Sequence, residues 1–443
     1  MKTILLLGAG KSSGTLIQYL LNNSTSDGFI LKVGDLSLAA AQSKVNKHSQ
    51  SIPFEFSIEN KEQREKEISS ADLVISLLPP ALHILAARDC VRFKKNLVTA
   101  SYVSDEIKCL HQEAVNANIL LLNECGLDPG IDHMSAMEII HRIKKSGGDI
   151  ASFKSYTGGL VAPESNDNPW GYKFTWNPRN VIVAGQGTAK YISKGEYKYI
   201  PYQRLFTEIE KVTVHDCGEF DGYANRDSLS YRKQYGLDSI PTVLRGTLRY
   251  KNYCAAWQVF VTLGLTDDSY KIENAENLTF AKIVESLLPS WVKGNSIAEK
   301  VAKLCGLDAG GEIMNMIQYT GIFEKQKTNL KNVSPAQVLQ HLLEQKWVLK
   351  EGDKDMIVMQ HIFEYQLNGE TKHLTSSLVV KGDDTTNTAM AKTVGLPLAI
   401  AARHILRGDI KLKGVQIPVI EELYQPILKE LSELGIQFTE SES

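Results

Sequence analysis

Paired cysteines, long apolar runs and an excess of charge of either sign are all missing from this chain. Its six cysteines are widely spaced and form no Cys-x-x-Cys pair, which argues against zinc or another bound metal and favours reduced thiols. No apolar run reaches about 18 residues, so we expect no membrane-spanning helix. The opening Met-Lys-Thr leads directly into an apolar strand pattern, so we expect no signal peptide and a cytoplasmic location.

The charge balance limits the class of partner. A formal net charge of −2 gives no general attraction to nucleic acid or to acidic membrane surfaces, so we expect a small-molecule ligand. At 443 residues the chain is long enough for two or three domains of about 150 residues each.

The first part of the chain alternates apolar strand patterns with helical patterns. We expect six strands at 3–8, 29–34, 53–56, 72–78, 96–100 and 119–123. Several are nearly continuous apolar runs, as is typical of strands covered on both faces. The alternation predicts an α/β protein that begins with a doubly wound, parallel Rossmann sheet.

The pattern changes after residue 123 and predicts a second α/β (α+β) domain with a helical insertion. The expected strands lie at 153–159, 211–217 and 245–250, with a hairpin of 355–366 and 371–380 around Asn368-Gly369, and the expected helices lie at 134–145, 390–406 and 419–434. We expect the tail, 439–443, to be frayed. The predicted domains are 1–123, 124–267 with 351–389, a helical insertion at 268–350, and 390–443, whose helices pack back on the first two domains.

A glycine-rich turn follows the first strand and opens a helix. Gly8 permits a sharp turn, Gly10 permits close approach of a pyrophosphate, and the helix start directs free N–H groups at that anion. Ser13 stands where the usual fingerprint has its third glycine, and a small residue still allows close helix packing. The alternative is a plain glycine turn. We predict a dinucleotide site that includes Gly8, Gly10, Lys11, Ser12 and Ser13.

Asp35 ends the second strand, about 20 residues beyond the glycine turn. A carboxylate there accepts both hydroxyls of an adenosine ribose and repels a 2′-phosphate. Lys32 is expected on the opposite face of the strand and offers no compensation. The pattern favours NAD over NADP, with Leu36 beside the ribose. The alternative is that Asp35 caps the next helix.

Further candidates stand where later strands end. Leu77 and Leu78 follow the fourth strand, and Ser101 and Tyr102 follow the fifth, so they are expected to border the nicotinamide. The alternative for the adjoining Pro79-Pro80 pair is helix initiation.

The loop after the sixth strand carries Asp128, Asp132 and His133. Carboxylates and a histidine at the edge of a cofactor cleft are plausible acid–base groups. In the alternative interpretation the two aspartates cap the following helix and the histidine packs at its start.

Arg226 and Arg245 each stand beside turn residues. Arginine binds carboxylates through two parallel, charge-assisted hydrogen bonds, so the pair suggests an acidic substrate. Each arginine alone is also compatible with a surface or ion-pair role.

Several long motifs resemble the saccharopine reductase family, the glutamate-forming saccharopine dehydrogenases of lysine metabolism. They are Thr99-Ala-Ser-Tyr-Val-Ser104, Asn123-Glu-Cys-Gly-Leu-Asp-Pro-Gly-Ile-Asp-His133, Gly158-Gly-Leu-Val-Ala-Pro-Glu-Ser-Asn-Asp-Asn-Pro-Trp-Gly-Tyr-Lys-Phe174, Asn225-Arg-Asp-Ser228, Arg245-Gly-Thr-Leu-Arg-Tyr250 and Ala389-Met-Ala-Lys-Thr-Val-Gly395. The likeness runs from residue 2 to about 437 and is far more specific than the glycine turn.

The resemblance implies a homodimeric oxidoreductase that joins glutamate and 2-aminoadipate 6-semialdehyde to saccharopine, or reverses that reaction, with NAD or NADP. It implies a cofactor site that includes Ser101, Leu127 and Asp128. It also implies a substrate site of Ser101, Tyr102, Asp128, Pro129, Arg226, Arg245, Gly246 and Thr247. We expect Asp128 and Tyr102 to be the catalytic pair.

Two positions depart from the fungal members of that family. Thr157 stands where they usually carry a cysteine, so no thiol role transfers. Asp35 stands where they tend to carry an arginine, which places their NADP preference in question here. The alternatives are a carboxynorspermidine-type reductase, which would need more acidic residues, and a non-catalytic dinucleotide sensor.

Overall fold

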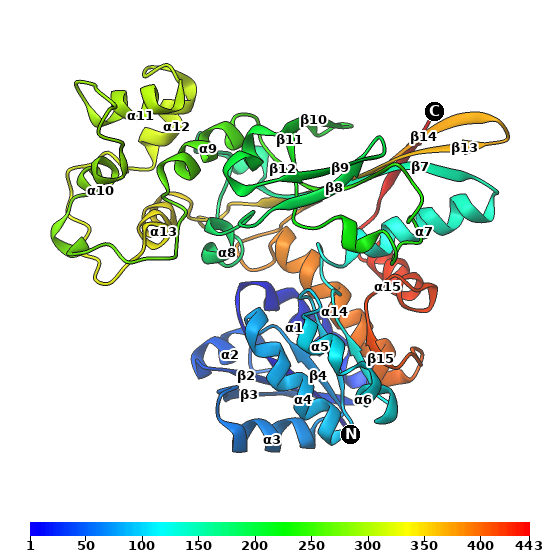
Figure 1. Cartoon of the computed structure of the whole chain (residues 1–443). Coiled ribbons are helices and arrows are strands. Elements are labelled where there is room, and N and C mark those ends of the chain that lie inside the picture. The colour runs from blue at the N-terminus through cyan, green and yellow to red at the C-terminus, as the bar shows by residue number, and fades with distance from the viewer. The chain divides into compact units, whose positions relative to one another are not determined.

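The computed structural model describes residues 1–443, and the chain divides into two compact units (Figure 1). The first unit comprises Met1–Ile150, Tyr365–Lys372 and Val380–Ser443, and the second comprises Ala151–Glu364 and His373–Val379. The finer division into four parts stays a prediction.

The first unit contains a seven-stranded sheet in the order β15-β6-β5-β4-β1-β2-β3, with every neighbouring pair parallel. Its strands are β1 (Lys2–Leu7), β2 (Phe29–Asp35), β3 (Ser51–Glu55), β4 (Leu73–Ser76), β5 (Asn96–Thr99), β6 (Leu120–Leu122) and β15 (Gly414–Gln416). The six expected strands are present, and Leu5, Leu6 and Leu7 are fully buried, as expected for strands covered on both faces. The strand order reverses between β1 and β4, which defines the crevice where doubly wound folds bind ligands.

Helices surround this sheet. They are α1 (Gly14–Asp27), α2 (Leu38–Val45), α3 (Lys61–Ser70), α4 (His83–Phe93), α5 (Asp105–Cys109), α6 (His111–Asn116), α7 (Ile131–Lys145), α14 (Ala389–Arg407) and α15 (Glu421–Glu433), with short 3-10 segments η1 (Lys11–Ser13) and η2 (Pro80–Leu82). The two C-terminal helices were expected, and α14 crosses α1 so closely that a Cβ on Gly395 would lie 3.0 Å from Leu16 Cβ. Arg403 ties three helices together through Asp27 at 2.7 Å and Glu430 at 2.8 Å.

The C-terminal tail corrects one expectation. Predicted to be frayed, it forms the short strand β16 (Thr439–Glu442). Its alternate glutamates have partners in the same unit: Glu440 pairs with Arg142 at 2.6 Å, and Glu442 contacts the Tyr365 hydroxyl. The polar composition suggested solvation, but these partners hold the tail in place.

The second unit is built on a mixed sheet, ordered β10-β11-β12-β7-β13-β14, with β8 and β9 attached at β12. The path ends on β16, next to β14. The strands are β7 (Asp149–Val161), β8 (Ala189–Ser193), β9 (Glu196–Ile200), β10 (Ile209–Val214), β11 (Gly218–Ala224), β12 (Thr242–Arg249), β13 (Asp355–Leu367) and β14 (Glu370–Lys381). The predicted hairpin is confirmed: Asn368 and Gly369 have φ of 54° and 84°, which suits a tight two-residue turn.

The helical part of the second unit packs around tryptophans. Its helices are α8 (Pro178–Ile182), α9 (Tyr253–Leu263), α10 (Phe280–Leu287), α11 (Ile297–Cys305), α12 (Glu312–Tyr319) and α13 (Pro335–Lys346), with 3-10 segments η3 (Pro163–Ser165), η4 (Tyr202–Thr207), η5 (Leu229–Tyr231) and η6 (Ala275–Asn277). Trp170, Trp257 and Trp347 are buried together, and the Trp170 ring stacks on Phe260 at 5.4 Å. A capping box at Ser334 starts α13.

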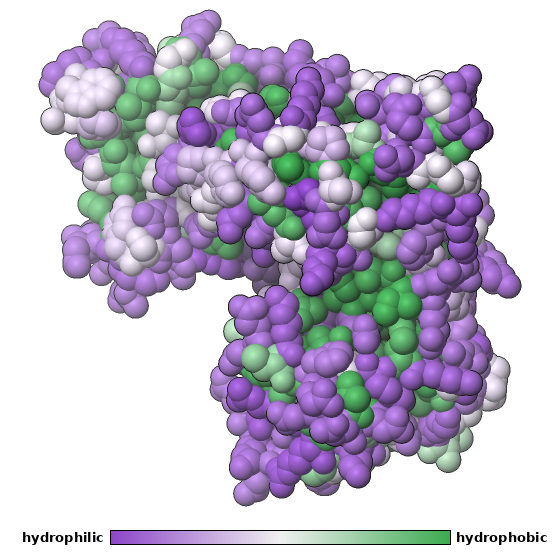
Figure 2. All heavy atoms as spheres, turned by 45° about the vertical axis from the view of Figure 1, so that its right-hand side comes forward, coloured by the Kyte–Doolittle hydropathy of each residue, from purple (hydrophilic) through white to green (hydrophobic).

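Polar side chains predominate on the face drawn in Figure 2, and apolar atoms reach the surface there in separate patches. None of the helices is both long and apolar enough to cross a bilayer.

Candidate active site

The glycine turn has the geometry that an anion-binding loop needs. Gly8 has φ of +102°, and its N–H donates to the Gly34 carbonyl at 2.8 Å. A Cβ on Gly8 would lie 3.1 Å from the Leu77 carbonyl oxygen, so the turn passes close to the end of β4. A Cβ on Gly10 would meet nothing within 4 Å. The backbone there is open to a ligand, and the turn fits a pyrophosphate.

The helix start supports this turn. Lys11, Ser12 and Ser13 form η1, which leads directly into α1. Ser13 is fully buried and its hydroxyl donates to the Gly10 carbonyl at 2.8 Å. A small side chain thus fills the place of the third glycine, while the start of α1 provides the N–H groups and the positive dipole end that stabilise a phosphate.

Asp35 lies beside the turn rather than capping a helix. Its carboxylate accepts hydrogen bonds from the N–H of Ala9 at 2.7 Å and of Ser37 at 2.9 Å. Ser37 caps α2, so the capping alternative for Asp35 is wrong. Lys32 is engaged by Glu67 and does not neutralise Asp35.

A surface hollow lies beside Leu36, the residue that follows Asp35. Leu36 is 77% exposed and forms one wall. The hollow is lined by Leu36, Glu55, Phe56, Ser57, Asn60 and Gln63, at the carboxyl ends of β2 and β3. This is the side of the crevice on which a doubly wound fold places the nucleoside.

The ends of β4 and β5 bring further predicted residues to the same edge. The Leu77 N–H donates to the Leu7 carbonyl at 2.8 Å, which holds Leu77 and Leu78 next to the glycine turn. Pro79 and Pro80 begin η2, so the helix-initiation alternative describes them. Ser101 and Tyr102 follow β5 and are partly exposed.

Tyr102 and Asp128 are brought together. The phenol of Tyr102 donates to Asp128 Oδ1 at 3.2 Å, although the two residues come from different loops. Asp128 is partly exposed, whereas its neighbours Leu127 and Pro129 are buried and hold the loop. A phenol and a carboxylate in this arrangement can hold and move a proton.

Asp132 and His133 have structural roles, although the predicted capping by an aspartate is absent: Gly130 is the N-cap of α7, which has no side-chain cap. Asp132 is 2% exposed and accepts from the Gly130 N–H at 2.6 Å. His133 is fully buried, with Nε2 2.9 Å from Glu124 Oε2, and Glu124 also accepts from the Val103 N–H at 3.0 Å. The network joins the loop after β6 to the loop that carries Tyr102.

In the second unit the two arginine segments lie side by side. The Asn225 N–H donates to the Arg245 carbonyl at 2.8 Å, and the Arg245 N–H donates to Ser228 Oγ at 2.9 Å. The loop that carries Arg226 is therefore fixed on β12. The Arg245 side chain is 5% exposed and its guanidinium lies 4.4 Å from the centre of the Tyr231 ring, whereas Arg226 is exposed.

Gly246 and Thr247 continue the same strand. A Cβ on Gly246 would lie 2.4 Å from Tyr156 Cε1, so close packing alone requires glycine there. Thr247 is two residues beyond Arg245 and shares its face of β12.

Two buried basic residues were not predicted as site residues. His83 contacts Ser76 at the end of β4 and Ser101 after β5. No sequence signal indicated this role, because the order of strands in the sheet determines which residues meet there. Arg249 belongs to a motif already noted; it is 6% exposed and lies over the rings of Tyr172 at 5.4 Å and Tyr253 at 5.3 Å.

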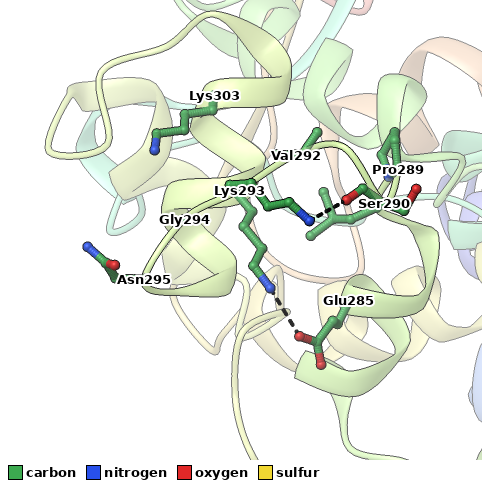
Figure 3. Close-up of a pocket in the computed structure, with 10 residues that line it drawn as sticks. Glu285, Pro289, Ser290, Val292, Lys293, Gly294, Asn295 and Lys303 are labelled. Carbon is green, nitrogen blue, oxygen red and sulfur yellow. Dashed lines mark hydrogen bonds and ion pairs between the residues drawn. The ribbon is translucent and has the colours of Figure 1, made fainter.

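A pocket in the helical part of the second unit contains none of the predicted residues (Figure 3). Lys300 pairs with Glu285 at 3.2 Å, and Lys293 donates to the Ser290 carbonyl at 2.9 Å. These lysines are engaged within the pocket wall. The six cysteines are all free thiols, and no group of three or more His, Cys, Asp or Glu side chains is arranged to hold a metal ion.

Comparison with known proteins decides the family. Residues 4–122 match the family model described as "Saccharopine dehydrogenase NADP binding domain", and residues 126–436 match "Saccharopine dehydrogenase C-terminal domain". The chain belongs to the saccharopine dehydrogenase family. The predicted resemblance and fold class are therefore confirmed, and the family implies a nicotinamide dinucleotide as cofactor.

Saccharopine dehydrogenases of fungi match the chain from end to end. The chain is 32% identical to "Saccharopine dehydrogenase [NADP(+), L-glutamate-forming]" of Pyricularia oryzae, over 99% of this chain and 98% of the relative. The apo saccharopine dehydrogenase (L-Glu forming) structure from Saccharomyces cerevisiae matches with a TM-score of 0.89, 31% identity and 100% coverage of both chains.

A longer relative also matches. "Alpha-aminoadipic semialdehyde synthase, mitochondrial" of Bos taurus is 36% identical over 99% of this chain but only 47% of its own length. The chain thus spans about half the length of this and similar curated relatives.

Proposed function

We propose that this chain is a nicotinamide-dinucleotide-dependent saccharopine dehydrogenase of the glutamate-forming type. The observation that carries the proposal is the end-to-end match to fungal enzymes of that name. Two contacts support the predicted motifs: Tyr102 with Asp128 in the first unit, and the Arg226 loop with the Arg245 strand in the second. By name, the relatives concern saccharopine and aminoadipic semialdehyde, which favours saccharopine over the carboxynorspermidine-type alternative.

The residues of the first unit fit the cofactor. The open backbone at Gly10 and the carboxylate of Asp35 suit the pyrophosphate and the ribose. The residues that would hold the dinucleotide are Gly8, Gly10, Lys11, Ser12, Ser13, Asp35, Leu36, Leu77, Leu78, Ser101, Leu127 and Asp128. When bound, the cofactor exchanges a hydride with the substrate carbon next to the secondary amine.

The chain's own residues bind the substrate and move protons. Saccharopine has three carboxylates, and Arg226 and Arg245 are suited to pair with two of them. Oxidation of the amine leaves an imine, and water then splits it into glutamate and the semialdehyde. That cleavage requires a proton on the departing nitrogen, and Tyr102 with Asp128 would transfer it.

The coenzyme is proposed to be NAD. The names of the fungal relatives specify NADP(+), but Asp35 ends β2, where doubly wound folds place the residue that contacts the adenosine ribose, and Lys32 is engaged by Glu67. A homodimer, small-molecule substrates and a cytoplasmic location complete the proposal.

Purified protein is expected to reduce a nicotinamide coenzyme when saccharopine is added. The measurement is the absorbance of the reduced coenzyme with NAD and NADP in parallel, and glutamate is assayed as the second product. A protein that binds coenzyme without turnover would be the sensor of the alternative hypothesis. Turnover of carboxynorspermidine but not saccharopine would overturn the substrate assignment.

Tyr102→Phe is expected to lower kcat for saccharopine about tenfold, because it removes a hydrogen bond to the Asp128 carboxylate. The dissociation constant for coenzyme, measured by fluorescence titration, should stay unchanged. A matched control is Tyr270→Phe, an exposed tyrosine of the helical insertion. Equal kcat for Tyr102→Phe and wild type would remove the phenol from the proton-transfer step.

A further inference from the structure

His83 joins the ends of two strands of the first unit. It is the first residue of α4 and is only 2% exposed. Its Nδ1 lies 2.8 Å from Ser76 Oγ, at the end of β4, and its Nε2 lies 2.7 Å from Ser101 Oγ, in the loop after β5. The imidazole thus connects a buried serine to a serine that belongs to the proposed site.

The ring is neutral. Burial lowers the pKa of His83 to about 4, and its position at a helix start also disfavours a positive charge. Both ring nitrogens face hydroxyl groups rather than carboxylates. A neutral imidazole has one N–H donor and one acceptor nitrogen, so the hydrogen bonds through His83 run in one direction.

The surrounding hydroxyls select that direction. Thr99 Oγ1 also approaches Nε2, at 3.4 Å. If Nδ1 carried the proton, the nearer Ser101 hydroxyl, at 2.7 Å, would take the lone pair at Nε2 and leave the buried Thr99 hydroxyl without an acceptor. Ser76, which is fully buried and whose hydroxyl contacts only the ring, would then have no acceptor for its own proton. With the proton on Nε2, Ser76 donates to Nδ1, and Thr99 is then the one buried hydroxyl of the three without an acceptor, because Ser101 is partly exposed and its proton is open to solvent or to a ligand. Fewer buried donors are left unsatisfied, so the Nε2–H tautomer is favoured.

We propose that His83 is a positioning residue that donates from Nε2 to Ser101 and so leaves the Ser101 hydroxyl proton for an acceptor oxygen of the bound ligand. The inference rests on the proposed function, which places Ser101 in the site. The acceptor belongs either to the substrate or to the coenzyme. In both cases a donor is fixed in direction before the ligand arrives, which lowers the cost of ordering it on binding.

The tautomer can be measured without any substrate. Nitrogen NMR of the histidine-labelled protein is expected to show His83 as the Nε2–H tautomer, with no titration down to about pH 5; an ordinary histidine titrates near 6.5. A spectrum of the Nδ1–H tautomer, or a titration near pH 6.5, would overturn the proposal. This result stands even if saccharopine is not the substrate, so the two failures are distinguishable.

Two variants separate positioning from packing. The amide of His83→Asn reaches about as far as Nδ1 and keeps the Ser76 contact, whereas the amide of His83→Gln reaches about as far as Nε2 and can still donate to Ser101. His83→Asn is expected to lower kcat/KM for saccharopine about tenfold, and His83→Gln to recover most of that loss. Equal losses at matched thermal stability would mean that His83 acts only in packing.

Ser101→Ala completes the test. If His83 acts through Ser101, the double variant Ser101→Ala/His83→Asn is no worse than Ser101→Ala alone. Additive losses would contradict the proposal. If Ser101→Ala raises the dissociation constant for coenzyme, the coenzyme is the ligand that accepts from Ser101. If it raises the KM for saccharopine, the substrate is that ligand. Either result supports the inference, whereas an unchanged dissociation constant together with an unchanged KM would refute it.

Discussion

Replacing Arg245 with alanine is expected to raise the KM for saccharopine by at least about 30-fold. The side chain is 5% exposed, so a substrate carboxylate bound there is largely shielded from water. Removing one partner of such a pair costs about 2–5 kcal/mol, and every 1.4 kcal/mol is tenfold in binding. The kcat should fall by a smaller factor than the KM rises, because Tyr102 and Asp128, which are proposed to transfer the proton, are unchanged in this variant.

Steady-state kinetics with varied saccharopine provide the measurement. Arg245→Lys keeps the charge but loses the two parallel hydrogen bonds, so its KM should lie between those of wild type and Arg245→Ala. Arg204→Ala removes an exposed arginine of the same unit and should change nothing. Because Arg245 also stacks on Tyr231, thermal denaturation should accompany the kinetics. An unchanged KM in a folded Arg245→Ala protein would exclude this arginine from the substrate site.

Wild-type protein is expected to prefer NAD to NADP, and Asp35→Ala is expected to narrow that preference by about ten- to a hundredfold. Two like charges about 4 Å apart repel by up to about 4 kcal/mol at an effective dielectric constant of 20, and solvent at this partly exposed site reduces the value. Lys32 is paired with Glu67, so the chain offers no compensating charge from that strand.

Asp35→Asn is the matched control for the backbone contacts. Its amide oxygen can still accept from the Ala9 N–H, whereas its charge is gone. Coenzyme dissociation constants and kcat/KM for both coenzymes should therefore change in the same direction in Asp35→Asn and Asp35→Ala. A wild-type preference for NADP, or a preference that survives both substitutions, would mean that Asp35 does not face a 2′-phosphate.

Local patterns predicted the fold of the first unit well. Strands β1, β4, β5 and β6 contain short apolar runs, and the glycine turn lies between a strand and a helix, so both could be recognised from neighbouring residues alone. β15 was not predicted, because three residues that begin at a glycine give no periodic signal. β16 was expected to fray, because its partners Arg142 and Tyr365 are far away in the sequence.

The candidate site was only partly predictable for the same reason. Gly8 and Asp35 could be predicted because the ends of the first two strands contact the dinucleotide in doubly wound folds. The contact of Tyr102 with Asp128, and the seating of the Arg226 loop on Arg245, depend on which loops meet in space. His83 was missed because its role depends on contacts with Ser76 and Ser101. These two serines meet at the imidazole only because β4 and β5 are neighbours in the sheet.

The crossing of α14 on α1 bears on how the protein is made. Gly395 lies against Leu16, and residues 380–443 belong to the same compact unit as residues 1–150. On the ribosome, the helix that covers α1 emerges only after nearly all of the second unit has been synthesised. A fragment that stops before residue 380 would leave the Leu16 face of α1 in water. The N-terminal 150 residues are therefore not expected to fold stably without the C-terminal helices.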